Sequence, residues 1–265
     1  ARKSSGFTLL MDSMIVILAP HLPVKTVADI IGEHDTRIWR VLEHYVQEAR
    51  SNEDLSNVHS VGVDETSRAK GHNYISVFVD LDESRVIHVC EGKDSGTVTS
   101  FKHDYEEHKG LAGDVANFCC DMSPAFISGI ESNFENAAIT FDRFHVMKLM
   151  NEAVDQVRRE EQAHNTNLKR TRYIWLKNPE NLTSKQVKEL GSLKDMHLKT
   201  SRAYDLKLSL RDFWNIRDPI IAESYLKKWY FWATHSRLVP VIDKAKTMPW
   251  GALLWLESTV LQLFF

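Results

Sequence analysis

The sequence of 265 residues predicts a mixed α/β domain that follows a pair of N-terminal helices and precedes a long helical segment. Three observations support this fold class. Short β-rich runs separated by turns recur between residues 58 and 142, apolar residues recur at helical spacing on both sides of them, and a Gly-containing turn interrupts the first helical stretch. The composition, 43% hydrophobic and 26% charged, is that of a globular protein with one large domain or two modest ones.

The first fifty residues show helical patterns. Residues 7–19 are typical of an apolar helix, and residues 23–50 of two helices joined by a tight turn. A small residue at Ala28, Gly32 in the turn and an aliphatic side chain at Ile38 are the pattern of a helix-turn-helix unit. An ordinary helical hairpin shares this pattern, so DNA binding remains one of two interpretations at this stage.

Strand and helix patterns alternate after a polar linker at residues 51–57. Strands are expected at 58–65, 73–81, 85–92, 114–121 and 137–142, and helices at 94–108, 123–133 and 144–162. Three antiparallel strands, a helix and a fourth strand begin a ribonuclease-H-like sheet, in which the first and fourth strands are neighbours. The remaining residues 163–248, rich in aromatic and basic side chains at helical spacing, predict an all-helical segment.

Two aspartates follow strands of the predicted sheet. Asp64 is expected at the end of the first strand, and Asp121 at the end of the fourth, just before Ser123 and Pro124 at a helix start. Because ligands gather beyond strand ends in open α/β sheets, both carboxylates could bind divalent cations together. Mg²⁺ prefers oxygen ligands, and two ions about 3.5–4 Å apart can catalyse phosphodiester displacement. The alternative is that Asp121 is a helix cap.

Other side chains admit a functional and a structural interpretation. Asp142 and His145, in the segment DRFH, follow the last strand, and His145 could contact phosphate or metal or make a structural hydrogen bond at a helix start. The aromatic and basic run at 225–232, YLKKWYFW, could stack on bases or pack in a core.

Charge is distributed unevenly along the chain, although the net charge is only −3. Residues 143–211 carry 15 Lys and Arg against 8 Asp and Glu, which fits a protein that holds a polyanion with this segment and metal ions with another. A solvated helical face would give the same pattern.

Three cysteines without a CxxC motif indicate a reduced interior and predict no zinc site within this chain. Residues 14–20, MIVILAP, are too few to span a bilayer, and no signal peptide is evident, so the expected compartment is the cytosol.

The order and spacing of eight segments resemble the transposases of bacterial insertion sequences in the ISL-three family. The resemblance runs from about Gly6 to Ser258. The segments are GFTLL, IGEHDTRIWRVL, VGVDETS, KGHNYISVFVDL, CCDMSPAFI, ITFDRFHVMKLMNEAVD, RYIWLKNPENLT and YFWATHSRL.

This resemblance implies a DDE transposase, which cleaves and transfers DNA strands at the ends of its element with Mg²⁺ or Mn²⁺. Asp64 and Asp121 would be the first two catalytic and metal-binding acids. Thr36, Arg37 and Arg40 on the second helix of the helix-turn-helix would contact DNA. The implied partners are the terminal inverted repeats of the element and further copies of the chain, with no membrane, in the bacterial cytoplasm at the nucleoid.

The resemblance also implies a division of the chain and two departures from the family. The expected parts are 1–50 as the helix-turn-helix DNA-binding segment, 51–57 as a linker, 58–162 as the ribonuclease-H-like catalytic core, 163–248 as a helical insertion and 249–265 as the start of a truncated C-terminal part. The family's cysteine-rich zinc-binding segment would lie upstream. Its third acid, in a pattern N-G-x-x-E-G-x-N, is absent, and Glu257 lies before the expected place. We therefore expect a fragment that binds DNA but cuts it little.

Two alternatives differ in activity or class. One is a catalytically inactive DNA-binding remnant or regulator. A nuclease of the same fold but a different biological role is a related alternative. The other is a phosphate-accepting α/β signalling domain, which needs a parallel sheet, whereas the first three strands are separated by gaps too short for crossover helices.

Overall fold

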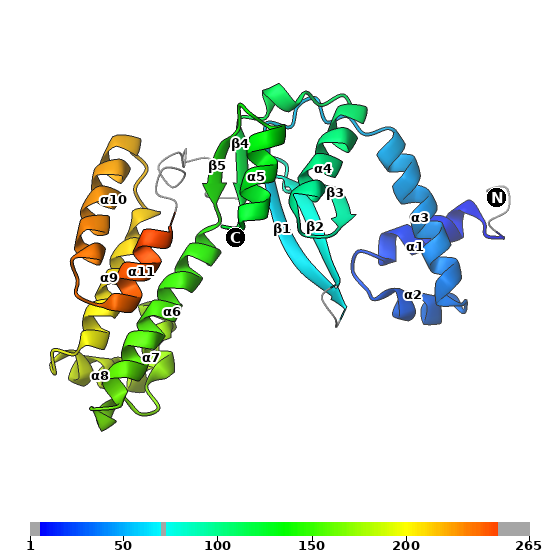
Figure 1. The fold of residues 1–265 in the computed structure, drawn as a ribbon. Coiled ribbons are helices and arrows are strands. Elements are labelled where there is room, and N and C mark those ends of the chain that lie inside the picture. Colours follow the sequence, from blue (N-terminus) through cyan, green and yellow to red (C-terminus); the bar gives the residue numbers. More distant parts are fainter. Residues whose placement is uncertain (1–5, 70–72, 249–265) are drawn as a thin grey trace. The chain divides into compact units, whose positions relative to one another are not determined.

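A computed structural model describes residues 6–69 and 73–248, which form two compact units, Ala1–Asn57 and Val58–Phe265 (Figure 1). No helix in these described ranges has both the length and the apolar character needed to cross a bilayer. The expected C-terminal part at 249–265, with its apolar tail and Glu257, lies outside the described residues.

The first unit contains three helices, α1 (Leu9–Leu18), α2 (Val24–Ile31) and α3 (Asp35–Ser51). Gly32 ends α2 in the left-handed conformation with φ 77°, which glycine adopts without steric cost. Ala28 and Ile38 are buried on either side of this turn, as the pattern of small, Gly and aliphatic residues predicted. Their core also includes Phe7, Ile15, Val27 and Val41.

The second unit begins with a five-stranded sheet. Its strands are β1 (Ser60–Ala69), β2 (Asn73–Asp80), β3 (Arg85–Glu91), β4 (Asn117–Cys120) and β5 (Ala138–Phe141). The order is β3-β2-β1-β4-β5, with antiparallel pairing among β1, β2 and β3 and parallel pairing of β1 with β4 and of β4 with β5. The predicted proximity of the first and fourth strands is confirmed. The antiparallel pairs exclude the parallel sheet of a phosphate-accepting signalling domain.

One strand boundary differs from the sequence prediction. Asp64 was expected at the end of the first strand, but β1 continues to Ala69, which pairs with Asn73 across the hairpin. The polar residues from Glu65 onward do not show the apolar alternation of a half-buried strand. They are extended because their backbone groups pair with β2.

Helices α4 (Ser95–Glu107) and α5 (Pro124–Asn133) pack against each other and cover one face of the sheet (Figure 1). Aromatic rings fill this interface. Phe101 of α4 stacks on Phe78 of β2 at 4.4 Å between centroids, and Phe134, just after α5, lies 5.2 Å from Phe118 of β4. Each of these four side chains is at most 1% exposed. The opposite face of β1 and β4 is therefore the one left for a site.

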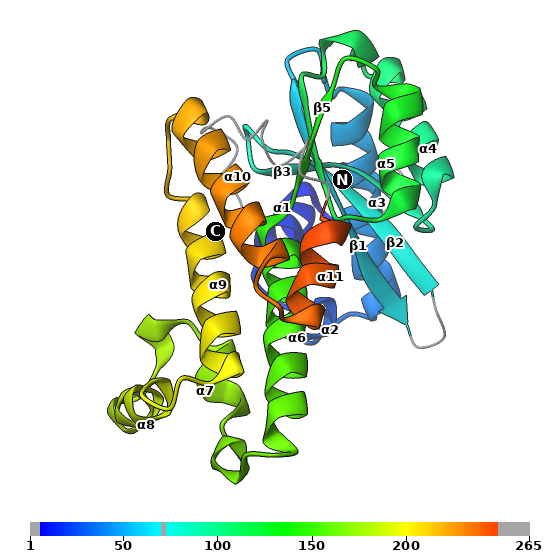
Figure 2. The same cartoon turned by 60° about the vertical axis from the view of Figure 1, so that its left-hand side comes forward.

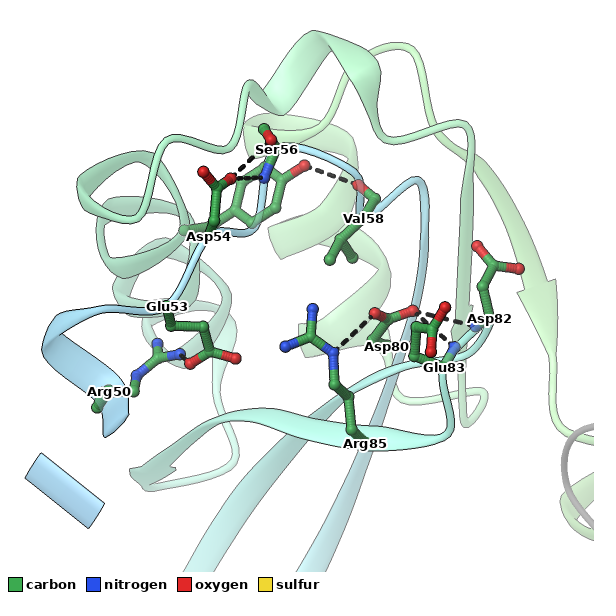
Figure 3. Close-up of polar contacts among 10 residues, drawn as sticks. Arg50, Glu53, Asp54, Ser56, Val58, Asp80, Asp82, Glu83 and Arg85 are labelled. Carbon is green, nitrogen blue, oxygen red and sulfur yellow. Dashed lines mark hydrogen bonds and ion pairs between the residues drawn. The ribbon is translucent and has the colours of Figure 1, made fainter. Parts of the chain in front are cut away.

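The β2–β3 turn is held by one buried carboxylate (Figure 3). Asp80 accepts hydrogen bonds from the backbone N–H groups of Asp82 and Glu83, at 3.1 and 3.2 Å, and from Arg85 Nε at 3.2 Å. Tyr105 Oη donates to the Val58 carbonyl at 2.8 Å, which fixes the chain just before β1. A short 3₁₀ turn, Ala112–Asp114, leads from α4 into β4.

The rest of the described chain is helical, as predicted for 163–248. It contains α6 (Arg143–Gln162), α7 (Arg172–Leu176), α8 (Ser184–Lys194), α9 (Lys199–Phe213), α10 (Pro219–Thr234) and α11 (Val239–Thr247), with 3₁₀ turns at Thr166–Leu168 and Pro179–Asn181. Helices α6, α9, α10 and α11 lie side by side (Figure 2).

The aromatic run at 225–232 has one face in the core of this helical part and one face exposed. Leu226 and Trp229 are 2% exposed, and Trp229 Nε1 donates to the Leu206 carbonyl at 2.8 Å. Phe231 and Trp232 are exposed. The packing interpretation therefore holds for the inner residues of the run.

Candidate functional site

Asp64 lies within β1, and Asp121 is the first residue after β4, the parallel neighbour of β1. The β1–β4 pairing places Gly62 beside Cys119, and each aspartate follows its paired residue by two positions. Side chains two apart on a strand point to the same face. Because Val61 and Val63 are buried with the α4 and α5 side of the sheet, Asp64 and Cys119 belong to the opposite face.

Asp64 lies beside a histidine that a second aspartate also approaches. Its Oδ1 is 4.0 Å from His145 Nε2, which is 3.7 Å from Asp142 Oδ2. The Asp64 side chain is 67% exposed, whereas those of His145 and Asp142 are 26% and 24% exposed. Asp142 also caps α6 by accepting a hydrogen bond from the Phe144 N–H at 2.8 Å. The N-terminal turn of α6 therefore places the His145 imidazole beside the sheet.

The pKa of the Cys119 thiol depends on its burial and on the charges near it. Burial raises the pKa of Cys119 to about 12; the neighbouring Thr140 hydroxyl lowers it, and the carboxylates of Asp142 and Asp64 raise it further. A thiol at this pKa stays protonated near neutral pH and is a poor nucleophile or metal ligand. Burial is therefore the main cause of this raised pKa, and the two carboxylates add to it.

Asp121 lies where β4 passes into α5. Its Oδ1 accepts a hydrogen bond from the Ser123 N–H at 2.8 Å, Ser123 is the N-cap residue, and Pro124 begins the helix. The structural interpretation of Asp121 as part of the helix start is thus correct in part. One carboxylate oxygen, Oδ1, makes this bond.

A cavity of about 810 Å³ lies between this face of the sheet and the helices that follow. Asp64 and Asp142 line one side, and three basic side chains, Arg143, Lys177 and Arg211, also line it. Asp121 is not among the described residues that line it. The cavity thus carries both acidic and basic walls, a combination suited to a phosphodiester beside carboxylates.

The basic wall is crowded with positive charge. Burial lowers the pKa of Arg143, the nearby Arg211 lowers it further, and Glu180 raises it. The Arg143 guanidinium lies 5.4 Å from the Trp214 ring centroid, and Arg211 Nη1 donates to both carboxylate oxygens of Glu180 at 2.8 and 2.9 Å. Sequence analysis found the basic segment but not these residues, because Lys177 and Arg211 reach the site only through tertiary packing.

Within the described ranges, no group of three or more His, Cys, Asp or Glu side chains is arranged to hold a metal ion. Mg²⁺ in proteins is usually held by one or two carboxylates together with substrate phosphate oxygens, so it does not need three such side chains.

Helix α3, the second helix of the predicted helix-turn-helix, has exposed polar side chains near its N-terminus. Thr36 and Arg40 are exposed, and the neighbouring Trp39 is 57% exposed, a residue that sequence analysis did not single out. Arg37 is more constrained: its Nη1 donates to Glu33 Oε2 at 2.6 Å, and its guanidinium lies 4.4 Å from the Phe7 ring centroid.

Comparisons with known proteins agree with this architecture. A family profile described as "Transposase" matches residues 61–250, and one described as "Helix-turn-helix domain of transposase family ISL3" matches residues 1–46. The chain is 24% identical over 282 aligned positions to the transposase for insertion sequence element IS1557 of Mycobacterium tuberculosis, which covers 92% of this chain and 61% of that protein.

A second relative is the transposase for insertion sequence element IS1001 of Bordetella parapertussis. It is 27% identical over 191 aligned positions, which cover 69% of this chain and 47% of that protein. The chain thus spans about half to three fifths of the length of these relatives.

Proposed function

The chain belongs to the ISL3 family of transposases, and from this premise we propose that it acts on the DNA ends of a bacterial insertion sequence. Its sheet would be a ribonuclease-H-like catalytic core. The observation that carries the proposal is the parallel pairing of β1, which contains Asp64, with β4, which Asp121 follows directly. Asp64 also lines a cavity that has both acidic and basic side chains.

The parts of the chain would have different roles in the reaction. We assign end recognition to residues 1–50, linkage to 51–57, catalysis to 58–162 and a helical insertion to 163–248. Thr36 and Arg40 would contact base edges or phosphates from the exposed face of α3, with Arg37 oriented by Glu33. By analogy with paired-end reactions, the active form would be a homo-oligomer in the cytoplasm at the nucleoid.

Asp64 and Asp121 would hold Mg²⁺ or Mn²⁺ together with phosphate oxygens of the DNA. When bound, such ions activate an attacking oxygen and stabilise the leaving oxygen of a phosphodiester. His145, between Asp64 and Asp142, would act as a positioning residue, because its imidazole approaches both carboxylates at 4.0 and 3.7 Å. The nucleophiles would be water and then a DNA 3′-hydroxyl.

The polypeptide of residues 1–265 supplies two of the three acids that the family motif comprises. We therefore propose that this polypeptide binds element ends but cleaves them little.

Metal-directed backbone cutting tests the carboxylate pair without relying on activity. Fe²⁺ with ascorbate and peroxide generates radicals beside its binding site, so cuts are expected near residues 64 and 121. Asp64→Asn and Asp121→Asn should each remove them, and Asp82→Asn, which alters an exposed turn carboxylate, should not. Cuts elsewhere, or cuts unchanged in both variants, would contradict the site.

A DNA assay tests recognition and activity together. The polypeptide should retard a duplex bearing a terminal repeat of its element, and the affinity should fall steeply with salt. Arg40→Gln should weaken binding, whereas Lys188→Gln on α8 should not. A Mg²⁺- or Mn²⁺-dependent nick abolished by Asp64→Ala would refute the low activity proposed for residues 1–265.

A further inference from the structure

A second cavity, of about 460 Å³, adjoins the first along α6. The two cavities share the lining residues Phe144, Met147, Asn151 and Leu176, so they form one continuous depression. We call it the α6 groove. It begins at the carboxylates of the sheet and continues along the helix toward Arg159.

The groove follows one face of a single helix. Phe144, Lys148, Asn151, Asp155 and Arg159 all line the second cavity and are spaced by four, three, four and four residues. Residues at this spacing lie on one face of a helix. From Phe144 to Arg159 this stripe is about 22 Å long at the helical rise of 1.5 Å per residue. A backbone with the spacing of B-form DNA would place about six nucleotides along it.

A buried carboxylate organises positive charge at the far end of the groove. Asp155 binds Arg158 at 2.7 Å, Arg159 at 2.8 Å and Arg172 at 3.3 Å. Burial raises the pKa of Asp155, but the hydrogen bond from Arg158 and the three guanidinium charges outweigh it, so the net pKa is lowered. One carboxylate thus faces three arginines, and the side chains of Arg159 and Arg172 are 68% and 48% exposed.

The other groove carboxylate beside this end is already paired. Glu152 accepts a hydrogen bond from Lys244 Nζ at 2.8 Å. Lys148 adds another cation to the lining of the second cavity. Positive charge therefore exceeds negative charge along this stretch, although the sheet end of the groove carries carboxylates.

Two features at the junction of the cavities suit an unstacked base. The Phe144 ring is 68% exposed and lies edge-on to His145, with 5.5 Å between centroids. The buried Asn151 Oδ1 has no hydrogen-bond partner among the described residues. An exposed aromatic face can stack on any base, and an amide oxygen can accept a hydrogen bond from an exocyclic amino group.

We propose that the α6 groove binds a DNA single strand that leads to the carboxylates. Lys148, Arg159 and Arg172 neutralise phosphates, and Phe144 stacks on a base where the strand reaches the sheet. The proposal rests on the proposed function only in taking the bound polyanion to be DNA. A groove that combines basic side chains with an exposed ring is the arrangement by which proteins hold single strands without sequence preference.

Cross-linking tests this strand path directly. A single-stranded oligonucleotide carrying 4-thiothymidine is irradiated with the 1–265 polypeptide in the absence of divalent ions, and cross-linked peptides are identified by mass spectrometry. Cross-links are expected in peptides that contain Phe144 and Tyr173, the latter 62% exposed beside Arg172. Cross-links confined to residues 24–51 would overturn the proposal.

Binding measurements with matched variants separate the charges from the ring. Arg159→Gln combined with Arg172→Gln should lower the slope of log affinity against log salt by about 1.4, since each phosphate contact of a single strand contributes roughly 0.7. Lys185→Gln combined with Lys188→Gln, two exposed lysines of α8, should leave the slope unchanged. Equal slopes in all three proteins would refute the role of the arginines.

The ring is tested with Phe144→Ala and Phe144→Trp. The alanine variant should bind roughly tenfold more weakly, from a stacking contribution of about 1–3 kcal/mol per base, and the tryptophan variant should retain affinity. Equal weakening by both variants would refute stacking. These binding measurements contain no divalent ion, so they do not depend on the proposed metal site. If the groove binds the strand but Fe²⁺ does not cut near residues 64 and 121, the metal site is rejected and the strand path is retained.

Discussion

Replacing Lys207 by methionine should remove a contribution to the free energy of unfolding that grows as pH rises above neutrality. The Lys207 side chain is fully buried in α9. Its Nζ donates to the carbonyls of Trp175 and Leu176 at 2.9 and 3.1 Å, and more weakly to that of Lys177 at 3.4 Å. The ammonium thus satisfies the C-terminal carbonyls of α7, which a short helix cannot pair internally.

The size of the gain follows from the pKa of this group. Burial lowers the pKa of Lys207 from 10.5 to about 8, the charge of Arg211 lowers it further, and Glu180 raises it. Between these two values the unfolded chain binds more protons than the folded one, so the free energy of unfolding rises with pH. Integrated from pH 7 to pH 9.5, the rise is about 2 kcal/mol.

Other groups act in the opposite direction over the same range. Burial raises the pKa of Cys119 and of Tyr105 to about 12, so their stabilising contributions are lost as pH rises through the unfolded values near 9 and 10 toward 12. These contributions are common to the wild type and the Lys207→Met variant. The difference between the two unfolding free energies therefore isolates Lys207 and is the quantity to measure.

Urea denaturation at pH 7.0, 8.0, 9.0 and 9.5 provides the assay, followed by tryptophan fluorescence, to which Trp175, Trp214 and Trp229 contribute. These tryptophans lie in the same helical segment as Lys207. Relative to the variant, the wild type should gain about 2 kcal/mol across this range. Lys188→Met, which removes an exposed lysine of α8, is the control. Parallel pH profiles for wild type and Lys207→Met would refute the burial argument.

Three further substitutions test single features of the packing. Asp155→Asn leaves the buried Arg158 without its carboxylate and should destabilise the second unit by about 3–5 kcal/mol in urea denaturation; a loss below 1 kcal/mol would mean that the pair is solvated. In Gly32→Ala the added Cβ meets no atom within 4 Å, so the substitution costs only the strain of a left-handed φ, roughly 1–2 kcal/mol. The loss should appear as reduced helix content on heating. An unchanged melting curve would contradict that backbone geometry. Trp229→Phe removes the hydrogen bond to the Leu206 carbonyl and some buried volume, and should cost roughly 1–2 kcal/mol, whereas a neutral result would show that the phenyl ring repacks.

Local patterns were sufficient to predict most of the elements. Periodicity predicted most helices and strands, and Ala28, Gly32 and Ile38 predicted the tight turn between α2 and α3. The adjacency of β1 and β4 was predicted from the order of elements, since three antiparallel strands, a helix and a fourth strand begin a ribonuclease-H-like sheet. The extension of β1 to Ala69 was missed, since it depends on cross-strand hydrogen bonds rather than on an apolar pattern.

The walls of the cavity could not be predicted in the same way. Lys177 and Arg211 lie far from Asp64 in the sequence, and only the packing of α6 on α9 brings their helices to the sheet. Lys207 resembles any other helical lysine in the sequence, yet it is buried. Burial of charge is a property of tertiary packing, so a single sequence does not reveal which basic residues of 143–211 face solvent.

The mutual repulsion within the basic wall gives a physical reason for an anionic ligand. Lys207 and Arg211 are one turn apart on α9, and the charge of Arg211 lowers the pKa values of both Lys207 and Arg143. Glu180 offsets part of this charge through Arg211, but it lies on the exposed side of the pair. A phosphate group in the cavity would relieve the repulsion and would stand opposite the Asp64 wall. The cations that line the cavity, Arg143 and Arg211 among them, therefore favour an anionic ligand there.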